Sequence, residues 1–182
     1  MAYRTLAPGQ RAQIWIGGPA NPRADLLFET DEMLFEAANW SLDGSCLFVN
    51  GDGALWRLDV DAPGRGLVRV DFQDLPELNN DHVLDPDGEH IYLSAMDGHI
   101  YRGALDGGAV DRISPEDGSW HFLHGICPDG SRLAYVHLDD FTKPGRLALL
   151  EPHGQPVVVE TGRGHIDGPA WSPDGRWIYF HT

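Results

Sequence analysis

The feature that most constrains this chain is a four-residue turn sequence, Ser-Pro-Asp-Gly or a close variant, that recurs at a nearly constant interval. Its four copies stand within WSLDGSCLFV, LDPDGEHIYL, ICPDGSRLAY and WSPDGRWIYF, which begin at positions 40, 84, 126 and 171. The aspartates of successive copies are separated by 44, 42 and 45 residues. A period of this length indicates stacked or circular structural repeats, so the fold follows from the repeat.

Each repeat predicts four short antiparallel strands joined by turns. Proline presets the backbone at the first turn position, aspartate accepts hydrogen bonds from nearby amides, and glycine adopts the tight exit. Runs of β-branched, aromatic and aliphatic residues flank each turn, and a further glycine-containing turn with two more such runs follows. Four antiparallel strands in a unit of about 40 to 45 residues are typical of a β-propeller blade.

The two ends of the chain each carry half a blade. Full blades are expected at 35–72, 82–114 and 122–161, with half-blades at 12–30 and 168–182. We therefore expect one all-β propeller domain of about four blades, whose terminal half-blades complete one blade and leave no exposed sheet edge. A chain closed in this way is a monomer, whereas half-blades that pair with another chain give an oligomer.

Composition and missing motifs exclude several classes of function. The formal net charge is -15, which argues against nucleic-acid binding because that needs clustered Lys and Arg. No apolar run approaches the roughly 20 residues of a membrane span. The N-terminus lacks the apolar core of a signal peptide, so we expect a cytoplasmic protein, or a periplasmic one if a leader has been removed. A Gly-rich phosphate loop, a nucleophile elbow and a Cys-pair zinc motif are all absent from the sequence.

The repeated WSPDGRWIYF-type motif resembles the repeat of TolB-like (WD40-like) propeller proteins over nearly the whole chain. The segments upstream of the turns, such as NNDHVLDPDG and GHIDGPAWSPDG, are similar to a subgroup of bacterial TolB-like transporter components. That subgroup usually has six blades, so the resemblance implies a shortened ring or a truncated piece that assembles in trans. Leu123 replaces the subgroup's tryptophan before His-Gly, and Ile166 replaces a polar residue.

Polar residues gather at the start of each strand that is expected to line the central channel, so their side chains are predicted to converge at one channel mouth. The candidate ligand-binding residues are Glu36, Asn80, Asp81, His82, His124, His165 and Asp167. Imidazoles beside carboxylates suit a divalent transition metal, the one cofactor suggested, and the candidate metal ligands are His82, His124 and His165. The same side chains could instead bond backbone groups between blades or brace turns.

Two functional hypotheses from different classes remain. The first is a non-enzymatic scaffold that holds a protein partner, or a small polar or carbohydrate ligand, at the channel mouth. The second is a metal-dependent lyase or hydrolase that acts on uronates or related sugar acids, with Asp81 or Asp167 as general base. We prefer the scaffold, because a site assembled from several blades is disrupted when two blades of the resembled ring are absent.

Overall fold

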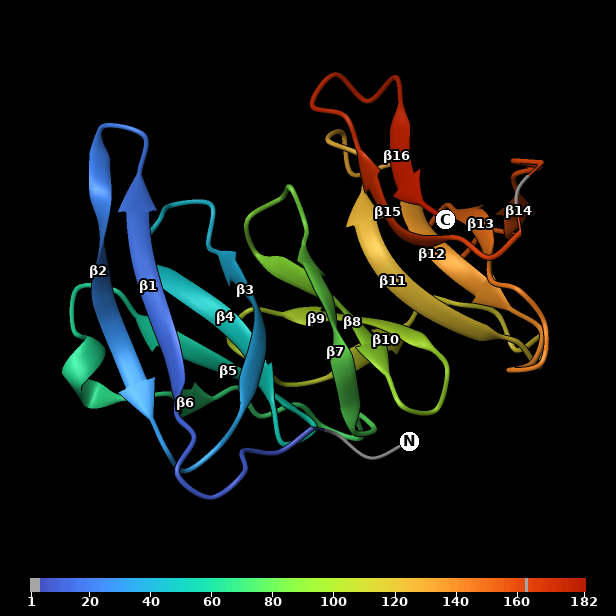
Figure 1. The fold of residues 1–182 in the computed structure, drawn as a ribbon. Coiled ribbons are helices and arrows are strands. Elements are labelled where there is room, and N and C mark those ends of the chain that lie inside the picture. Colours follow the sequence, from blue (N-terminus) through green and yellow to red (C-terminus); the bar gives the residue numbers. More distant parts are fainter. Residues whose placement is uncertain (1–3, 163) are drawn as a thin grey trace. The chain divides into compact units, whose positions relative to one another are not determined.

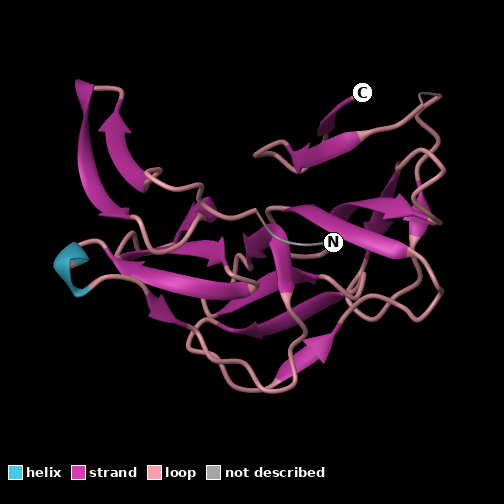
Figure 2. Ribbon diagram, turned by 60° about the horizontal axis from the view of Figure 1, so that its bottom comes forward, coloured by secondary structure: helices cyan, strands magenta, loops and turns pink. Residues whose placement is uncertain are grey.

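A computed structural model describes residues 4–162 and 164–182, and almost all of the regular secondary structure in these residues is β-strand (Figure 1). Its one helical element there is the short 3-10 turn η1 (Pro63–Arg65), visible in cyan in Figure 2. None of the described residues belongs to a helix that is long and apolar enough to cross a membrane. The chain divides into two compact units, one ending at Val70 and the other comprising Asp71–Thr182.

The first unit contains a hairpin and one four-stranded antiparallel sheet, which we call a blade. The hairpin strands are β1 (Ala12–Gly18) and β2 (Asn21–Thr30). The blade strands, in spatial and sequence order, are β3 (Phe35–Trp40), β4 (Cys46–Gly51), β5 (Ala54–Asp59) and β6 (Val68–Arg69). Ala12 and Ile14 of the hairpin share one buried apolar cluster with Phe35, Val49 and Leu58 of the blade. Burial of this cluster holds the hairpin on the blade.

The second unit contains two blades and a second hairpin. The first blade consists of β7 (Leu78–Leu84), β8 (His90–Ala95), β9 (Ile100–Ala104) and β10 (Val110–Arg112). The second consists of β11 (Trp120–Ile126), β12 (Leu133–Leu138), β13 (Arg146–Leu150) and β14 (Val157–Val158). The hairpin pairs β15 (Asp167–Trp171) with β16 (Ile178–His181). The first strands of the two blades and of the hairpin lie side by side, because β11 contacts both β7 and β15.

The predicted sequence of strands is confirmed: a pair, three sheets of four, and a second pair follow one another along the chain. Both blades of the second unit begin before their predicted starts at 82 and 122, with β7 at Leu78 and β11 at Trp120. The polar segment 79–81 resembles a loop in the sequence, but it lies in a register shift within β7, so the strand continues through it. The union of the two hairpins into one blade stays a prediction.

The turn aspartates perform the role that the repeat predicts. In all four turns the aspartate Oδ1 accepts the amide N–H two residues later, at 2.8 to 3.1 Å. The Ser41 hydroxyl and then the Ser45 amide lower the pKa of Asp43 to about 2. The Ser131 hydroxyl and amide lower that of Asp129 to the same value. The repeated motif is therefore a structural device that stabilises each hairpin turn.

Candidate functional site

The first strand of every blade, and β15 of the second hairpin, contains a β-bulge close to a predicted site residue. The register against the next strand shifts between Glu36 and Asn39, Leu78 and His82, Leu123 and Gly125, and Asp167 and Ala170. A bulge leaves a residue outside the ladder and redirects its side chain, and bulges are over-represented next to functional sites. In the second unit, the recurrence of the bulge in β7, β11 and β15 explains how side chains of different strands come to point at one place.

In the second unit, two of the predicted carboxylates lie on either side of the predicted His124 imidazole. Nδ1 of His124 lies 3.7 Å from Oδ1 of Asp81, and Nε2 lies 3.1 Å from Oδ1 of Asp167. The three side chains come from β11, β7 and β15 respectively. Asp81 and His124 are about one-fifth exposed, and Asp167 is half exposed. We call Asp81, His124 and Asp167 the Asp-His-Asp cluster; it is accessible from solvent mainly on the Asp167 side.

Asp167 is also held by its own hairpin. Its Oδ1 accepts the Gly168 amide N–H at 2.8 Å, and its Oδ2 lies 3.8 Å from Nε2 of the exposed His181. Gly168 has φ +59, and a Cβ there would lie 2.9 Å from the His181 ring. Glycine is therefore required at this position for Asp167 and His181 to lie side by side. His181 adjoins the site without having been predicted; only its pairing with Asp167 across β15 and β16 reveals this.

The other predicted residues have different surroundings. His165 is exposed, and its Nδ1 accepts the Gly145 amide N–H at 2.9 Å. His82 is buried in β7, and Asn80 is exposed in the bulge of the same strand. Glu36 belongs to the first unit, where it forms an ion pair of 2.5 Å with Arg4. The assignment of all seven residues to a ligand site, and of His82, His124 and His165 to a metal, stays a prediction.

The chemistry of the Asp-His-Asp cluster follows from its charge. Two carboxylates outweigh one imidazole, whether that imidazole is neutral or protonated, so the cluster is anionic in either state. Such a group attracts cations and donors of hydrogen bonds, and its imidazole can accept or release a proton. The cluster is therefore suited to binding amines or polyhydroxy compounds.

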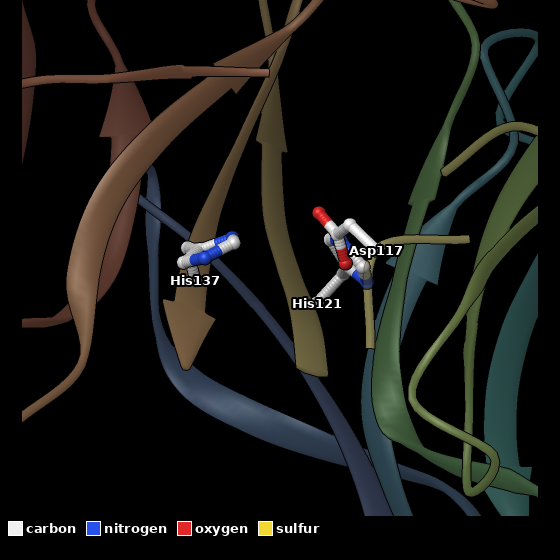
Figure 3. A group of neighbouring side chains, drawn as sticks. All are labelled: Asp117, His121 and His137. Carbon is white, nitrogen blue, oxygen red and sulfur yellow. The ribbon is translucent and has the colours of Figure 1, made fainter. Parts of the chain in front are cut away.

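A second group of titratable side chains, Asp117, His121 and His137, lies in the same unit but was not predicted (Figure 3). One donor atom of each lies within 4.8 Å of the others. His121 and His137 are buried and directly opposite each other on β11 and β12. The signal was present in the sequence, because both histidines stand eight residues from the turn residue Asp129.

The electrostatics of this second group separate its members. Burial lowers the pKa of His121, although the Gly98 carbonyl and the Asp117 carboxylate act in the opposite direction. Burial acts to raise the pKa of Asp117, but the Ser119 amide and the nearby imidazoles prevail and hold it below its usual value. A neutral imidazole and an ionised carboxylate are therefore expected together at neutral pH.

Comparison with known proteins relates the chain to one group of propellers. No family model matches the chain. An uncharacterized protein of Agrobacterium fabrum is 33% identical over 184 residues, which cover 98% of this chain and 61% of the relative. The solved structure of a protein assigned as TolB in Agrobacterium tumefaciens has a TM-score of 0.76 and 32% identity, and the match covers 87% of this chain and 57% of that one.

A more distant structure supports the fold alone. The β-propeller domain of Cps50 (Swd1) from Myceliophteria thermophila matches with a TM-score of 0.58 and 16% identity, over 79% of this chain and 46% of that one. The chain spans about three-fifths of the length of the two Agrobacterium proteins.

Proposed function

We propose that this chain, which is similar to a TolB protein of known structure, is a TolB-like β-propeller that serves as a binding scaffold, and that its Asp-His-Asp cluster holds a cationic or hydroxyl-rich ligand. The proposal rests on the two carboxylates beside His124, whose oxygens lie 3.7 Å (Asp81) and 3.1 Å (Asp167) from its ring nitrogens. The three residues belong to bulged strands of three successive sheets. Propellers commonly bind ligands and partners where their first strands converge, but the fold alone assigns no function.

The charge of the cluster supports this class of ligand. The acidic overall composition, with a net charge of -15, adds a long-range attraction for cations. Asp167 is half exposed and Asp81 is largely covered, so a ligand approaching from solvent meets Asp167 first. A small amine, an amino sugar or a basic side chain of a partner protein could form charge-assisted hydrogen bonds with both carboxylates.

The alternative, a metal-dependent enzyme acting on uronates, has less support from this cluster. A uronate is an anion, and two carboxylates around one imidazole repel it unless a cation lies between them. The cluster by itself therefore favours binding of a cation over turnover of a sugar acid.

Ligand-observed NMR tests the proposal with three probes: putrescine, glucosamine and galacturonate. We expect the wild-type chain to bind the two cationic probes, and the double variant D81N/D167N to lose that binding because its cluster carries no formal negative charge. D111N removes one carboxylate from the exposed strand β10 and serves as the control that keeps binding. Binding of galacturonate in preference to the amines, or unchanged binding in D81N/D167N, would contradict the proposal.

A further inference from the structure

We infer that Asp117, His121 and His137 form a binding site for one divalent transition-metal ion, separate from the Asp-His-Asp cluster. Figure 3 shows the two imidazoles on the adjacent strands β11 and β12, with Asp117 beside His121. The ring centroids of the histidines are 5.8 Å apart, and one donor atom of each of the three residues lies within 4.8 Å of the others. Two imidazoles and one carboxylate match the ligand preference of zinc and of iron(II).

Hydrogen bonds fix which nitrogen of each ring is available. Nδ1 of His121 lies 2.8 Å from the Gly98 carbonyl oxygen, which can only accept, so Nδ1 donates and Nε2 keeps its lone pair. Nε2 of His137 lies 3.2 Å from Oδ1 of Asp139, so Nε2 donates and Nδ1 keeps its lone pair. Metal-binding histidines are oriented in this way, with the second nitrogen bonded to a carbonyl or a carboxylate.

Both available nitrogens are buried acceptors that the surrounding chain does not satisfy. Nε2 of His121 and Nδ1 of His137 have no hydrogen-bond partner within the described part of the chain, and the same holds for the hydroxyl of Tyr135. The Tyr135 ring centroid is 5.3 Å from that of His121 and 6.2 Å from that of His137, so three side chains that each carry an unsatisfied polar group pack together. Such groups are rare in folded proteins and each destabilises the native state, which makes a missing partner at this place the simplest explanation.

The position of Asp117 identifies that partner as a cation. Its Oδ1 lies 3.5 Å from Nε2 of His121, so a carboxylate oxygen faces the lone pair of a nitrogen. Two ligand atoms on one tetrahedral zinc ion are about 3.3 Å apart, given metal–ligand distances near 2 Å. A metal ion between the two atoms converts their repulsion into attraction, and Nδ1 of His137 supplies the third ligand.

The neighbours of the three residues support the site from outside. Asp139, which orients His137, is itself held by Arg146 at 2.6 Å. Oδ1 of Asp117 accepts the Ser119 amide N–H at 2.9 Å, which fixes the carboxylate before β11 begins. The Asp117 side chain is about one-third exposed, whereas that of His121 is fully buried. The proposed site is therefore open to solvent on the Asp117 side, from which a metal ion could enter.

Cobalt(II) is the probe for the first test, because its visible absorption reports on coordination and it substitutes for zinc in nitrogen–oxygen sites. Chain stripped with a chelator is titrated with Co²⁺ and followed by absorption and by native mass spectrometry. We expect one Co²⁺ per chain. D117N, which removes a ligand charge at a partly exposed position without creating a cavity, should weaken binding by more than about 100-fold, whereas D139N should weaken it by about 10- to 100-fold.

H124N is the matched control, because it removes an imidazole from the Asp-His-Asp cluster and from the ligand set predicted from the sequence. We expect H124N to bind Co²⁺ like the wild type. Long-range ¹H–¹⁵N NMR with Zn²⁺ adds a second readout: the ¹⁵N signals of His121 Nε2 and His137 Nδ1 should shift, and those of the opposite nitrogens should change little. Absence of Co²⁺ binding in the wild type, equal affinity in D117N, or loss of binding in H124N would overturn the inference.

Discussion

Replacing Arg102 by methionine removes the cation that neutralises a buried carboxylate in the second repeat. Nε of Arg102 donates to Oδ2 of Asp85 at 2.9 Å, and the guanidinium also reaches Asp87 at 2.6 Å. Asp85 is 7% exposed and stands at the turn position where two other repeats have Ser41 and Ser172. The methionine side chain keeps most of the aliphatic stem of arginine, so the variant isolates the loss of charge.

The expected effect is set by burial. Loss of one partner from a fully buried ion pair costs about 3–5 kcal/mol, but the Arg102 side chain is 29% exposed and water screens the remaining carboxylate, so we expect about 2 kcal/mol. Adding Asp85→Ser to R102M should restore stability to within about 0.5 kcal/mol of the wild type, because the hydroxyl of Ser41 at the equivalent position already donates to its turn aspartate and accepts an amide.

Urea unfolding followed by tryptophan fluorescence measures both variants. With a slope of about 2 kcal/mol per molar, the midpoint of R102M should fall by about 1 M. R176M, at an exposed position, is the control and should shift the free energy of unfolding by less than about 0.5 kcal/mol. The reasoning is refuted if R102M loses less than about 0.5 kcal/mol, or if the double variant R102M/D85S is no more stable than R102M.

Two further predictions concern the turns and the core. Folding lowers the pKa values of Asp43 and Asp129 from 3.8 to about 2, so both carboxylates stabilise the native state above pH 3.8 and lose that contribution as the pH falls towards 2. The urea midpoint of the wild type should therefore decline between these pH values, and that of D43N/D129N should decline less steeply. Leu133 is fully buried, so the free energy of unfolding of L133A should be about 3 kcal/mol lower than that of the wild type in the same assay. L42A, at a side chain that is 63% exposed, should change it little, and equal losses in the two variants would contradict the assigned core.

The fold was accessible from the sequence because its determinants are local. The turn motif specifies a hairpin by its own chemistry, as the Ser41 and Asp43 hydrogen bonds show, and runs of β-branched, aromatic and aliphatic residues specify the flanking strands. Four repetitions of one local signal gave the number and order of the strands. The start of β7 was displaced, since a bulge lets polar residues continue a strand that the sequence pattern does not predict. β11 also starts before its predicted position, at Trp120.

The Asp-His-Asp cluster was accessible in part, because equivalent positions of successive repeats lie side by side once the repeats stack. That symmetry brought Asp81, His124 and Asp167 into one set with His165, but it did not predict that Nδ1 of His165 accepts the Gly145 amide N–H. Repeat symmetry places backbones, whereas the direction of each side chain depends on the bulge and on local hydrogen bonds that differ between repeats.

The sequence by itself determined the repeat, the strand order, the roles of the turn aspartates and the residue types available for a site, because these depend on contacts between residues close in the chain. Only the tertiary structure decided which titratable groups meet. The pairing of His121 with His137 has a local signal, their equal distance from the Asp129 turn, but the tautomer of His121 is set by the Gly98 carbonyl, 23 residues earlier in the chain. Gly98 belongs to the preceding blade, so this partner is chosen by the packing of whole strands and no local pattern contains it.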